Sequence, residues 1–297
     1  MDSARLNIWV NPFFDVSFAA NPLIYWIGAV IISFFFSIRF AGIYHINRRS
    51  IAVAGVCSLL GAFGFNQLFV VLATTSGIFH NSHGALSIAK GGNSIFIALV
   101  GGSLISSLYL RYKKVSFLEY ADALVPAFAL GYIVTRIGCF FNGCCFGVRS
   151  DLPWAVRFPE HTMAFFDHWS KGWLRSGDVL SLPVHPTQLY HAAAGFFLFL
   201  LLRQCQGKWR GSRVALGIAS YGFLRFFLQF VRGDRTPVLG FLDINQIFSL
   251  IFLLIAGLLW WRLGRQQKTS KKVIAALPSA NTIQSERLQC GQKSELK

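Results

Sequence analysis

Residues 129–147 read ALGYIVTRIGCFFNGCCFG, an apolar run that contains one arginine and ends in a stretch rich in glycine and cysteine. The apolar character begins upstream at Tyr120, so residues 120–137 are long enough to cross a bilayer as one helix. Arg136 lies near the end of that run. An arginine at this depth usually faces a partner or a water-filled cavity, because its burial in lipid costs several kcal/mol. The stretch therefore predicts a membrane helix that carries a functional cation.

The composition of the whole chain is that of a polytopic membrane protein. Of its 297 residues, 54% are apolar and only 13% are charged, about half the charged share of a soluble domain. This abundance of apolar surface excludes an intrinsically disordered chain and argues against a soluble enzyme. We expect an all-α fold with about seven transmembrane helices. The apolar stretches are residues 22–38, 51–73, 94–110, 120–137, 189–202, 214–231 and 244–261.

The distribution of basic residues predicts the orientation of these helices. The formal net charge is +16, from 28 Lys and Arg against 12 Asp and Glu. The loops after the first, third and fifth stretches, together with the C-terminal tail, hold 18 of the 28 cations. Because such residues concentrate on the cytoplasmic side, the N-terminus is expected outside and the C-terminus in the cytoplasm. The charge is thus a topology signal and predicts no nucleic-acid partner.

The connection at residues 139–184 is long and rich in aromatic residues, among them Trp154, Trp169 and Trp173. Such side chains favour the membrane–water interface, so we expect short helices that form an interfacial cap on the periplasmic side. Residues 1–263, with this cap included, are expected to form one transmembrane domain. Residues 264–297 are polar and basic, which predicts a disordered cytoplasmic tail near anionic lipid.

Two arginines lie well inside predicted spans, Arg136 in the fourth and Arg225 in the sixth, and Asp122 is the only comparable acid. One structural ion pair with Asp122 is the plainer explanation. However, Arg225, Gln229 and Arg232 share one helix face at i, i+4 and i+7, so the cations outnumber the acid. Guanidinium groups bind phosphate with two hydrogen bonds and stay charged when desolvated. We therefore expect a site for the phosphate of a phospholipid.

The segment after Arg136 combines glycines, Asn142 and three cysteines. Asn142 is placed either to orient a lipid headgroup or to cap the end of the helix. The spacing of Cys139, Cys144 and Cys145 fits no standard zinc pattern, and adjacent cysteines cannot easily both bind one ion. The sequence therefore predicts no metal site, and it leaves packing and a disulfide as the two alternatives.

The motif HPTQLYH at residues 185–191 opens the fifth predicted span. Pro186 suits the first turn of a helix, because the missing N–H has no partner there. His185 is either a structural residue at the interface or a catalytic base. Gln188 and Tyr190 follow at helical spacing, so we expect them to support a headgroup or an active site.

Three motifs together resemble the prolipoprotein diacylglyceryl transferases. They are HPTQLY (185–190), R-I-G-x-F-x-N-G-x-x-x-G (136–147) and Y-G-x-x-R-F-x-x-x-F-x-R (221–232), in the family's order. The resemblance implies an enzyme of the bacterial inner membrane that needs no cofactor. Its partners would be membrane lipids, with phosphatidylglycerol as donor, and a preprolipoprotein as acceptor. The diacylglyceryl group would pass to the lipobox cysteine thiol, and glycerol phosphate would leave.

The resemblance also implies roles for individual residues. Arg136 and Arg225 would bind the phosphate and act in catalysis, and His185 is a candidate base. The expected substrate-binding residues are Asn142, Gly147, Tyr221, Arg232, Gln188 and Tyr190.

The chain departs from the family pattern in the acid–base half of the site. The histidine expected on the third span is absent, and Cys139, Cys144, Gln229 and His191 replace an Asn, an acidic residue and two Glu. These departures leave three alternatives open. One is a divergent phosphatidylglycerol-dependent transferase that acts on a glycan or a lipid headgroup. The others are a non-catalytic phospholipid-binding protein and a channel or transporter with an arginine-lined anion path.

Overall fold

The computed structural model describes residues 9–10, 22–44, 46–75, 94–205, 209–233, 235 and 237–276. Within them, seven helices of at least 18 residues each overlap one of the seven apolar stretches. They are α1 (Pro22–Ala41), α2 (Arg48–Thr75), α4 (Ser94–Tyr112), α5 (Phe117–Phe141), α7 (Thr187–Gln204), α8 (Ser212–Gln229) and α9 (Ile244–Ala276). The expectation of a mostly helical membrane protein is confirmed.

Four of these helices have the length and hydropathy of membrane spans. The spans are Leu23–Tyr44, Arg48–Phe69, Phe117–Phe141 and Ile244–Gln267, and Ile97–Tyr112 in α4 is a shorter apolar helix. The helices α7 and α8 have 18 residues each and include polar residues such as Gln188, His191, Arg225 and Gln229. Those polar residues lower the mean hydropathy of α7 and α8.

The remaining elements are short. The 3-10 helix η3 (Gly42–Tyr44) follows α1, and α6 (Met163–Ser170) lies between α5 and α7. Strand β1 (Trp9–Val10) pairs in parallel with β2 (Val156–Arg157), and β3 (Pro237–Leu239) pairs antiparallel with β4 (Leu242–Asp243) just before α9.

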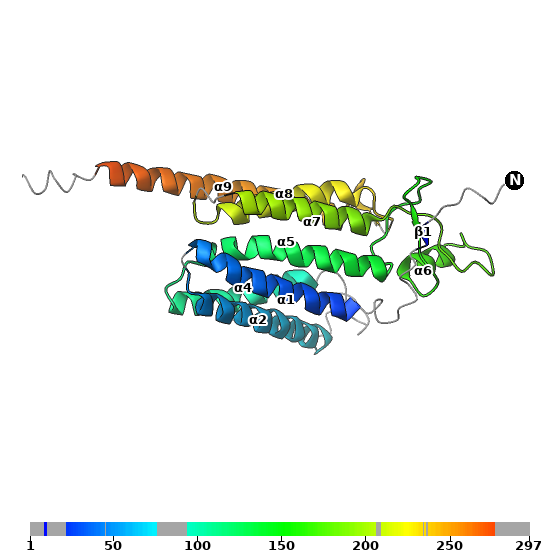
Figure 1. The fold of residues 1–297 in the computed structure, drawn as a ribbon, viewed down its shortest axis with the longest axis horizontal. Helices are drawn as coiled ribbons and strands as arrows, with labels where there is room; N and C mark the ends of the chain where they lie inside the picture. Colours follow the sequence, from blue (N-terminus) through cyan, green and yellow to red (C-terminus); the bar gives the residue numbers. More distant parts are fainter. Residues whose placement is uncertain are drawn as a thin grey trace, which may run out of the picture.

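Helix α5 lies at the centre of the bundle (Figure 1). It contacts α1, α4, α7 and α8, while α2 packs mainly on α4, and α9 packs mainly on α8. Small residues permit the closest approach: a Cβ added to Gly101 of α4 would lie 2.5 Å from the carbonyl oxygen of Gly61 in α2. Such small-residue contacts are typical of helices that pack in a membrane.

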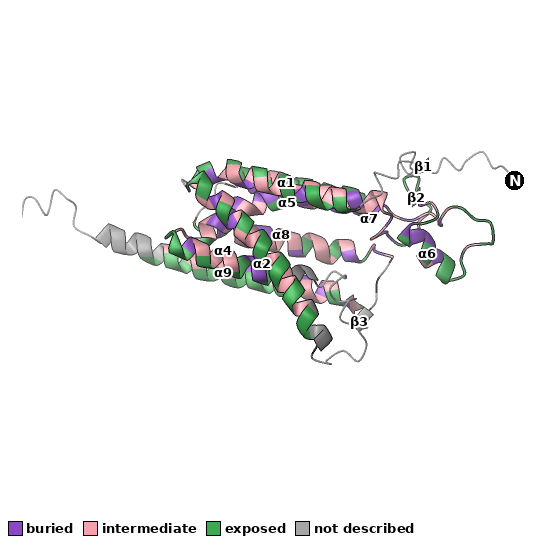
Figure 2. Ribbon diagram, turned by 90° about the horizontal axis from the view of Figure 1, so that it is seen from below, coloured by how far each residue is buried: buried purple, intermediate pink, exposed green. Residues whose placement is uncertain are grey.

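The outer surface of the bundle is apolar, as in a protein surrounded by lipid. Leu60 and Phe63 of α2 and Phe197 of α7 are each 67% exposed, and exposed residues line the outside of the long helices in Figure 2. By contrast, buried positions include polar residues such as Gln188 and His191. An exposed apolar belt of this extent marks a surface that contacts lipid or a protein partner.

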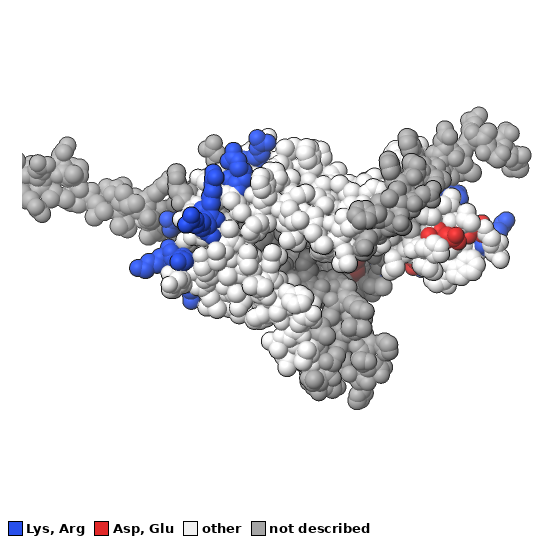
Figure 3. Space-filling model, turned by 60° about the horizontal axis from the view of Figure 1, so that its bottom comes forward, with Lys and Arg blue, Asp and Glu red and all other residues white. Residues whose placement is uncertain are grey.

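The bundle has one basic end. Figure 3 shows Lys and Arg gathered at the end from which α9 projects, and the connection that contains α6 lies at the other end. Helix α9 has 33 residues, which corresponds to about 50 Å and exceeds the roughly 30 Å of a hydrocarbon core. Helix α9 ends at Ala276, so residues 264–276 are helical, although the sequence predicted that a disordered tail begins there. Residues 277–297 lie outside the described part of the chain.

Asp122 lies at this basic end and does not pair with Arg136. Its carboxylate is buried and accepts hydrogen bonds from the backbone N–H groups of Gly211 (2.7 Å) and Val214 (2.8 Å) at the start of α8. Fourteen residues separate Asp122 from Arg136 along α5, which is about 21 Å. The interpretation of an ion pair between them is therefore wrong, because Asp122 caps a helix instead.

Candidate active site

Arg136 and Arg225 come together near the end of the bundle opposite the basic loops. On α5, Tyr132 and Arg136 are four residues apart, so they share one helix face, and Tyr221 and Arg225 are related in the same way on α8. The rings of Tyr132 and Tyr221 meet edge to face with centroids 5.7 Å apart. The guanidinium of Arg136 lies over the Tyr132 ring at 4.7 Å from its centroid. The α5–α8 contact thus joins the two predicted arginines in one site.

The two guanidinium groups have unused hydrogen-bonding capacity. Nε of Arg136 and Nη1 of Arg225 are buried without a hydrogen-bond partner among the described residues. Within the same part of the chain, no carboxylate lies within ion-pair distance of either arginine. Buried charges are normally paired, so this arrangement suits an anionic ligand with several oxygen atoms.

His191 of α7 contacts Tyr132 and so belongs to the same site as the two arginines. Its Nδ1 lies 2.9 Å from the Tyr132 hydroxyl, and its Nε2 is buried with no partner among the described residues. His185 lies elsewhere: its Nδ1 is 3.1 Å from the hydroxyl of Tyr190, which also accepts a hydrogen bond from Trp154 (2.8 Å). His191, and not His185, is therefore the histidine that hydrogen-bonds to Tyr132, the residue whose ring lies under Arg136. Tyr190 and His185 instead link the connection that contains Trp154 to the start of α7.

The backbone around Gly147 anchors Arg232 to the same site. Gly147 N–H donates to the carbonyl of His185 (2.9 Å), and Gly233 N–H donates to the carbonyl of Phe146 (3.0 Å). Gly147 and Arg232 form an antiparallel bridge. A Cβ added at Gly147 would lie 2.5 Å from the Cβ of His185, so this close passage requires glycine. Gly147 therefore shapes the site through the backbone.

Thr187 and Gln188 of the HPTQLY motif hold the cysteine turn. The Thr187 hydroxyl donates to the carbonyl of Cys145 (2.6 Å), and Nε2 of Gln188 donates to the carbonyl of Cys144 (2.8 Å). Both side chains are fully buried. In this structure, Gln188 thus contacts the turn itself, a role that its helical spacing alone did not indicate.

Asn142 ends α5. It is the C-cap residue, and its backbone N–H donates to the carbonyl of Gly138 (3.0 Å). The structure thus shows the helix cap, which the backbone of Asn142 makes, and the headgroup role of its side chain stays a prediction.

The sulfur atoms of Cys139, Cys144 and Cys145 lie within 4.8 Å of one another, and all three residues are free cysteines. Hydrogen bonding to the other two sulfurs lowers the pKa of the Cys145 thiol, and the positive charges of Arg232 and Arg136 act in the same direction. The cysteine turn therefore borders the arginine group.

Gln229, which occupies the position of a family Glu, is tied to the start of α9. Its Nε2 donates to Oδ2 of Asp243 (2.5 Å), and Oδ1 of Asp243 accepts from the backbone N–H of Gln246 (2.9 Å). All three residues are buried. Asp243 did not stand out in the sequence, because it lies between predicted spans. Residues 91–93, which directly precede the third predicted span, lie outside the described part of the chain.

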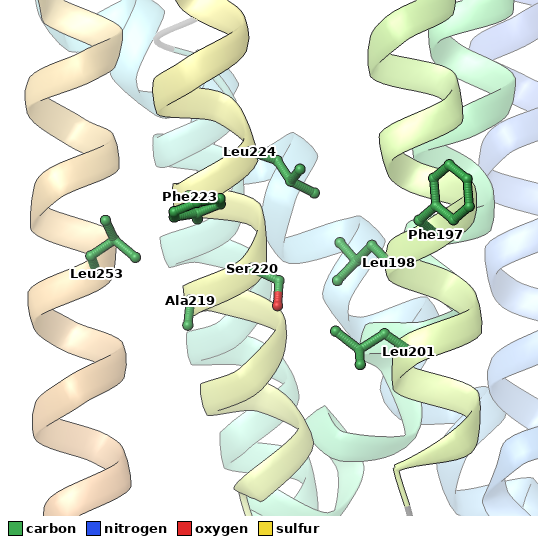
Figure 4. Close-up of a pocket in the computed structure, with 8 residues that line it drawn as sticks. All are labelled: Phe197, Leu198, Leu201, Ala219, Ser220, Phe223, Leu224 and Leu253. Atoms are coloured by element: carbon green, nitrogen blue, oxygen red, sulfur yellow. The ribbon is translucent and has the colours of Figure 1, made fainter.

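An apolar cavity of about 420 Å³ opens between α7 and α8, with Leu253 of α9 at its edge. Figure 4 shows Phe197 and Leu201 on one side and Phe223 and Leu224 on the other. Ala219, Ser220, Phe223 and Leu224 line it from α8, whereas Arg225 is on another face of the same helix, because consecutive helical residues point about 100° apart. The groove has the apolar lining that a lipid chain requires.

Comparison with known proteins agrees with these features. A family model described as prolipoprotein diacylglyceryl transferase matches residues 15–262. A Bordetella avium protein named phosphatidylglycerol–prolipoprotein diacylglyceryl transferase is 34% identical over 237 residues, which is 74% of this chain and 83% of that protein. A Clostridium tetani protein of that name is 28% identical over 224 residues, covering 75% and 84%.

A Corynebacterium efficiens protein of the same name is 30% identical over 199 residues, 66% of this chain. The match spans 62% of the length of that relative. Since the family model covers most of the sequence, the chain belongs to the prolipoprotein diacylglyceryl transferase family.

Proposed function

We propose that this protein transfers the diacylglyceryl group of phosphatidylglycerol to the lipobox cysteine thiol of a preprolipoprotein and releases glycerol phosphate. The observation that carries the proposal is the pair of guanidinium groups of Arg136 and Arg225, each of which has a buried nitrogen without a hydrogen-bond partner among the described residues. Helix α8, which carries Arg225, also lines an apolar groove, and relatives of the chain are named for this reaction.

The donor lipid would bind in two parts. Its phosphate would take hydrogen bonds from Arg136 and Arg225, and Arg232 would add positive charge from the bridge to Gly147. An acyl chain would lie in the groove between α7 and α8, which opens at the apolar surface. This arrangement supports lateral entry of the lipid from the bilayer.

In the proposed reaction, the acceptor sulfur attacks the glyceryl carbon next to the phosphate ester. A C–S bond forms, the C–O bond breaks, and the electron pair stays on the phosphate oxygen of the departing glycerol phosphate. The arginines would stabilise this growing negative charge, an effect that is large in a site shielded from water.

His191 is better placed than His185 to take the proton of the acceptor thiol. In the tautomer whose Nδ1–H donates to the Tyr132 oxygen, Nε2 of His191 carries a free lone pair. His185 would instead support the site through Tyr190 and the Gly147 backbone.

We also propose seven membrane spans in the bacterial inner membrane, with the N-terminus outside and the cap at the outer surface. The basic end of the bundle would face the cytoplasm. Trp154, Trp169 and Trp173 at the other end are 45–52% exposed, as suits an interfacial cap. Residues 1–263 would form the transmembrane domain and residues 264–297 a cytoplasmic extension that begins as the end of α9.

The test is a transfer assay with the full chain in liposomes. Phosphatidylglycerol labelled in its acyl chains is incubated with a lipobox peptide or with the same peptide carrying Ser in place of Cys. Label on the Cys peptide alone, with release of glycerol phosphate, supports the proposal. Headgroup turnover that needs a glycan or lipid acceptor instead would contradict it, and so would tight lipid binding without any product.

A further inference from the structure

The three sulfurs next to the arginine group form the only cluster of metal-binding side chains found in the described part of the chain. Cys139 lies in the last turn of α5, and Cys144 and Cys145 lie in the turn that follows. The three sulfurs are within 4.8 Å of one another and only partly exposed. Deprotonated thiols are soft metal ligands, so this cluster offers three donor atoms to one ion.

The backbone explains how adjacent cysteines face the same point. Gly143 has a φ of +62° and Cys145 a φ of +59°, a conformation that is uncommon for residues other than glycine. This turn brings the sulfurs of both Cys144 and Cys145 toward Cys139. Two adjacent cysteines can thus direct their sulfurs to one point in this turn, an arrangement that the sequence alone made difficult to expect.

Neighbouring helix α7 holds this strained turn in place. Thr187 and Gln188, both fully buried, donate hydrogen bonds to the carbonyl groups of Cys145 and Cys144. Strained backbone persists only where the surroundings fix it, and it concentrates at functional sites. The sulfurs are thus positioned from two helices before any ligand arrives.

We propose that Cys139, Cys144 and Cys145 bind one Zn²⁺ ion and leave its fourth coordination position open. Zinc binds thiolates at about 2.3 Å in a tetrahedral geometry, so the ligand sulfurs would be about 3.8 Å apart. The observed spacing requires only a small contraction. Three thiolates and one Zn²⁺ carry a net charge of −1, and Arg136 and Arg232 lie close enough to interact with Cys145 electrostatically.

The open position gives this site a role in the transfer reaction. This step of the inference rests on the proposed function. Three protein ligands with one free position are typical of catalytic zinc. The acceptor thiol would bind there as a thiolate and lose its proton to His191. Its sulfur would then form the C–S bond while the C–O bond to phosphate breaks, and the resulting thioether, a weak ligand, would leave the metal. Cys139 and Cys144 would thus take the place of the Asn and the acidic residue that the family resemblance implies at these two positions.

Metal binding is tested on the full chain in detergent, without any lipid substrate. Metal-free protein is titrated with Cd²⁺, whose bonds to thiolates absorb in the ultraviolet, and Zn²⁺ is then added as competitor. We expect saturation at one equivalent, and Cys139→Ser, Cys144→Ser and Cys145→Ser each to weaken binding by at least about tenfold. The matched controls, Cys57→Ser in α2 and Cys205→Ser after α7, should bind as the wild type does.

Three results would overturn the metal site: no saturable binding, binding that the three variants retain, or a disulfide within the cluster in the protein as isolated. For the open position, a peptide with a free cysteine should change the absorption of the cadmium-loaded protein, and the serine peptide should not. An unchanged spectrum with both peptides would overturn the role of the open position. Neither arm depends on transfer activity, so failure of this inference is distinguishable from failure of the proposed function.

Discussion

The hydroxyl of Tyr132 lies 2.9 Å from Nδ1 of His191, and the ring of the same tyrosine supports the guanidinium of Arg136. One side chain of α5 thus fixes both the imidazole of α7 and the cation one turn further along its own helix. This relationship assigns two separable functions to Tyr132, one to its ring and one to its hydroxyl.

Tyr132→Phe should therefore lower the rate of transfer by about fivefold to tenfold, since the variant keeps the ring under Arg136 and loses one hydrogen bond of about 1 kcal/mol. The KM for phosphatidylglycerol should stay close to the wild-type value. Initial rates with the lipobox peptide measure both quantities. The matched control is Tyr120→Phe, which removes a buried hydroxyl that contacts Ser58 away from the site. Equal losses in the two variants would contradict the positioning of His191.

The shape of the guanidinium group should matter as well as its charge. Arg225→Lys keeps the cation but cannot place two parallel N–H groups on a phosphate. Because such donors contribute most where charge develops in the transition state, we expect transfer to fall by about 100-fold or more. Arg262→Lys, at an exposed position of α9, is the control and should retain full activity. A loss of less than tenfold for Arg225→Lys would contradict a role of Arg225 in the reaction.

Much of the fold follows from the sequence alone. Long apolar stretches predicted seven helices, and the surplus of arginines over acids in the predicted spans indicated a cationic site for a phosphate. These features depend on composition and on helical spacing, both of which can be read locally.

Other features depend on contacts between distant segments, which no local pattern reveals. Asp122 caps α8 from 89 residues away, and Gln188 bonds to the turn at Cys144, 44 residues upstream. The left-handed backbone of Cys145, which aligns the sulfurs, is likewise set by the turn and by α7. Sequence reasoning therefore found the charges of the site and missed how the site is held.

The apolar groove provides a test of where the donor lipid lies. Ala219 lines the groove on α8, whereas Ala193 is exposed on α7 and does not line it. Ala219→Trp should fill the groove and raise the KM for phosphatidylglycerol with long acyl chains by about tenfold, the effect of losing roughly 1.4 kcal/mol of apolar contact. Short-chain phosphatidylglycerol should be affected less, because it needs less of the groove.

The control for the groove is Ala193→Trp, which adds the same bulk to an exposed helix face. It should leave the KM for both lipids unchanged. If the two tryptophan variants behave alike, or if Ala219→Trp affects both lipids equally, the acyl chain does not occupy this groove.

His168 makes the stability of the cap depend on pH. The imidazole is almost completely buried against Phe146 and Trp173, and its Nδ1 accepts a hydrogen bond from the backbone N–H of Leu182 (3.2 Å). Burial lowers the pKa of His168 below its ordinary value of 6.5. The folded protein therefore binds this proton more weakly than the unfolded chain does. The contribution of neutral His168 to stability is complete above pH 6.5 and is lost progressively as the pH falls below that value.

Protonation would also place a hydrogen on Nδ1, which can then no longer accept from Leu182. We expect the Tm of the wild type in detergent to fall by about 2–4 °C more than that of His168→Gln between pH 7.5 and pH 5.5, as for a loss of about 1 kcal/mol. Glutamine suits this comparison because it stays neutral and still offers an oxygen to the Leu182 N–H. The same pH dependence in both proteins would show that protonation of His168 does not limit the stability of the cap. A steeper loss in the wild type would identify this buried imidazole as the group through which mild acid loosens the cap beside the arginine site.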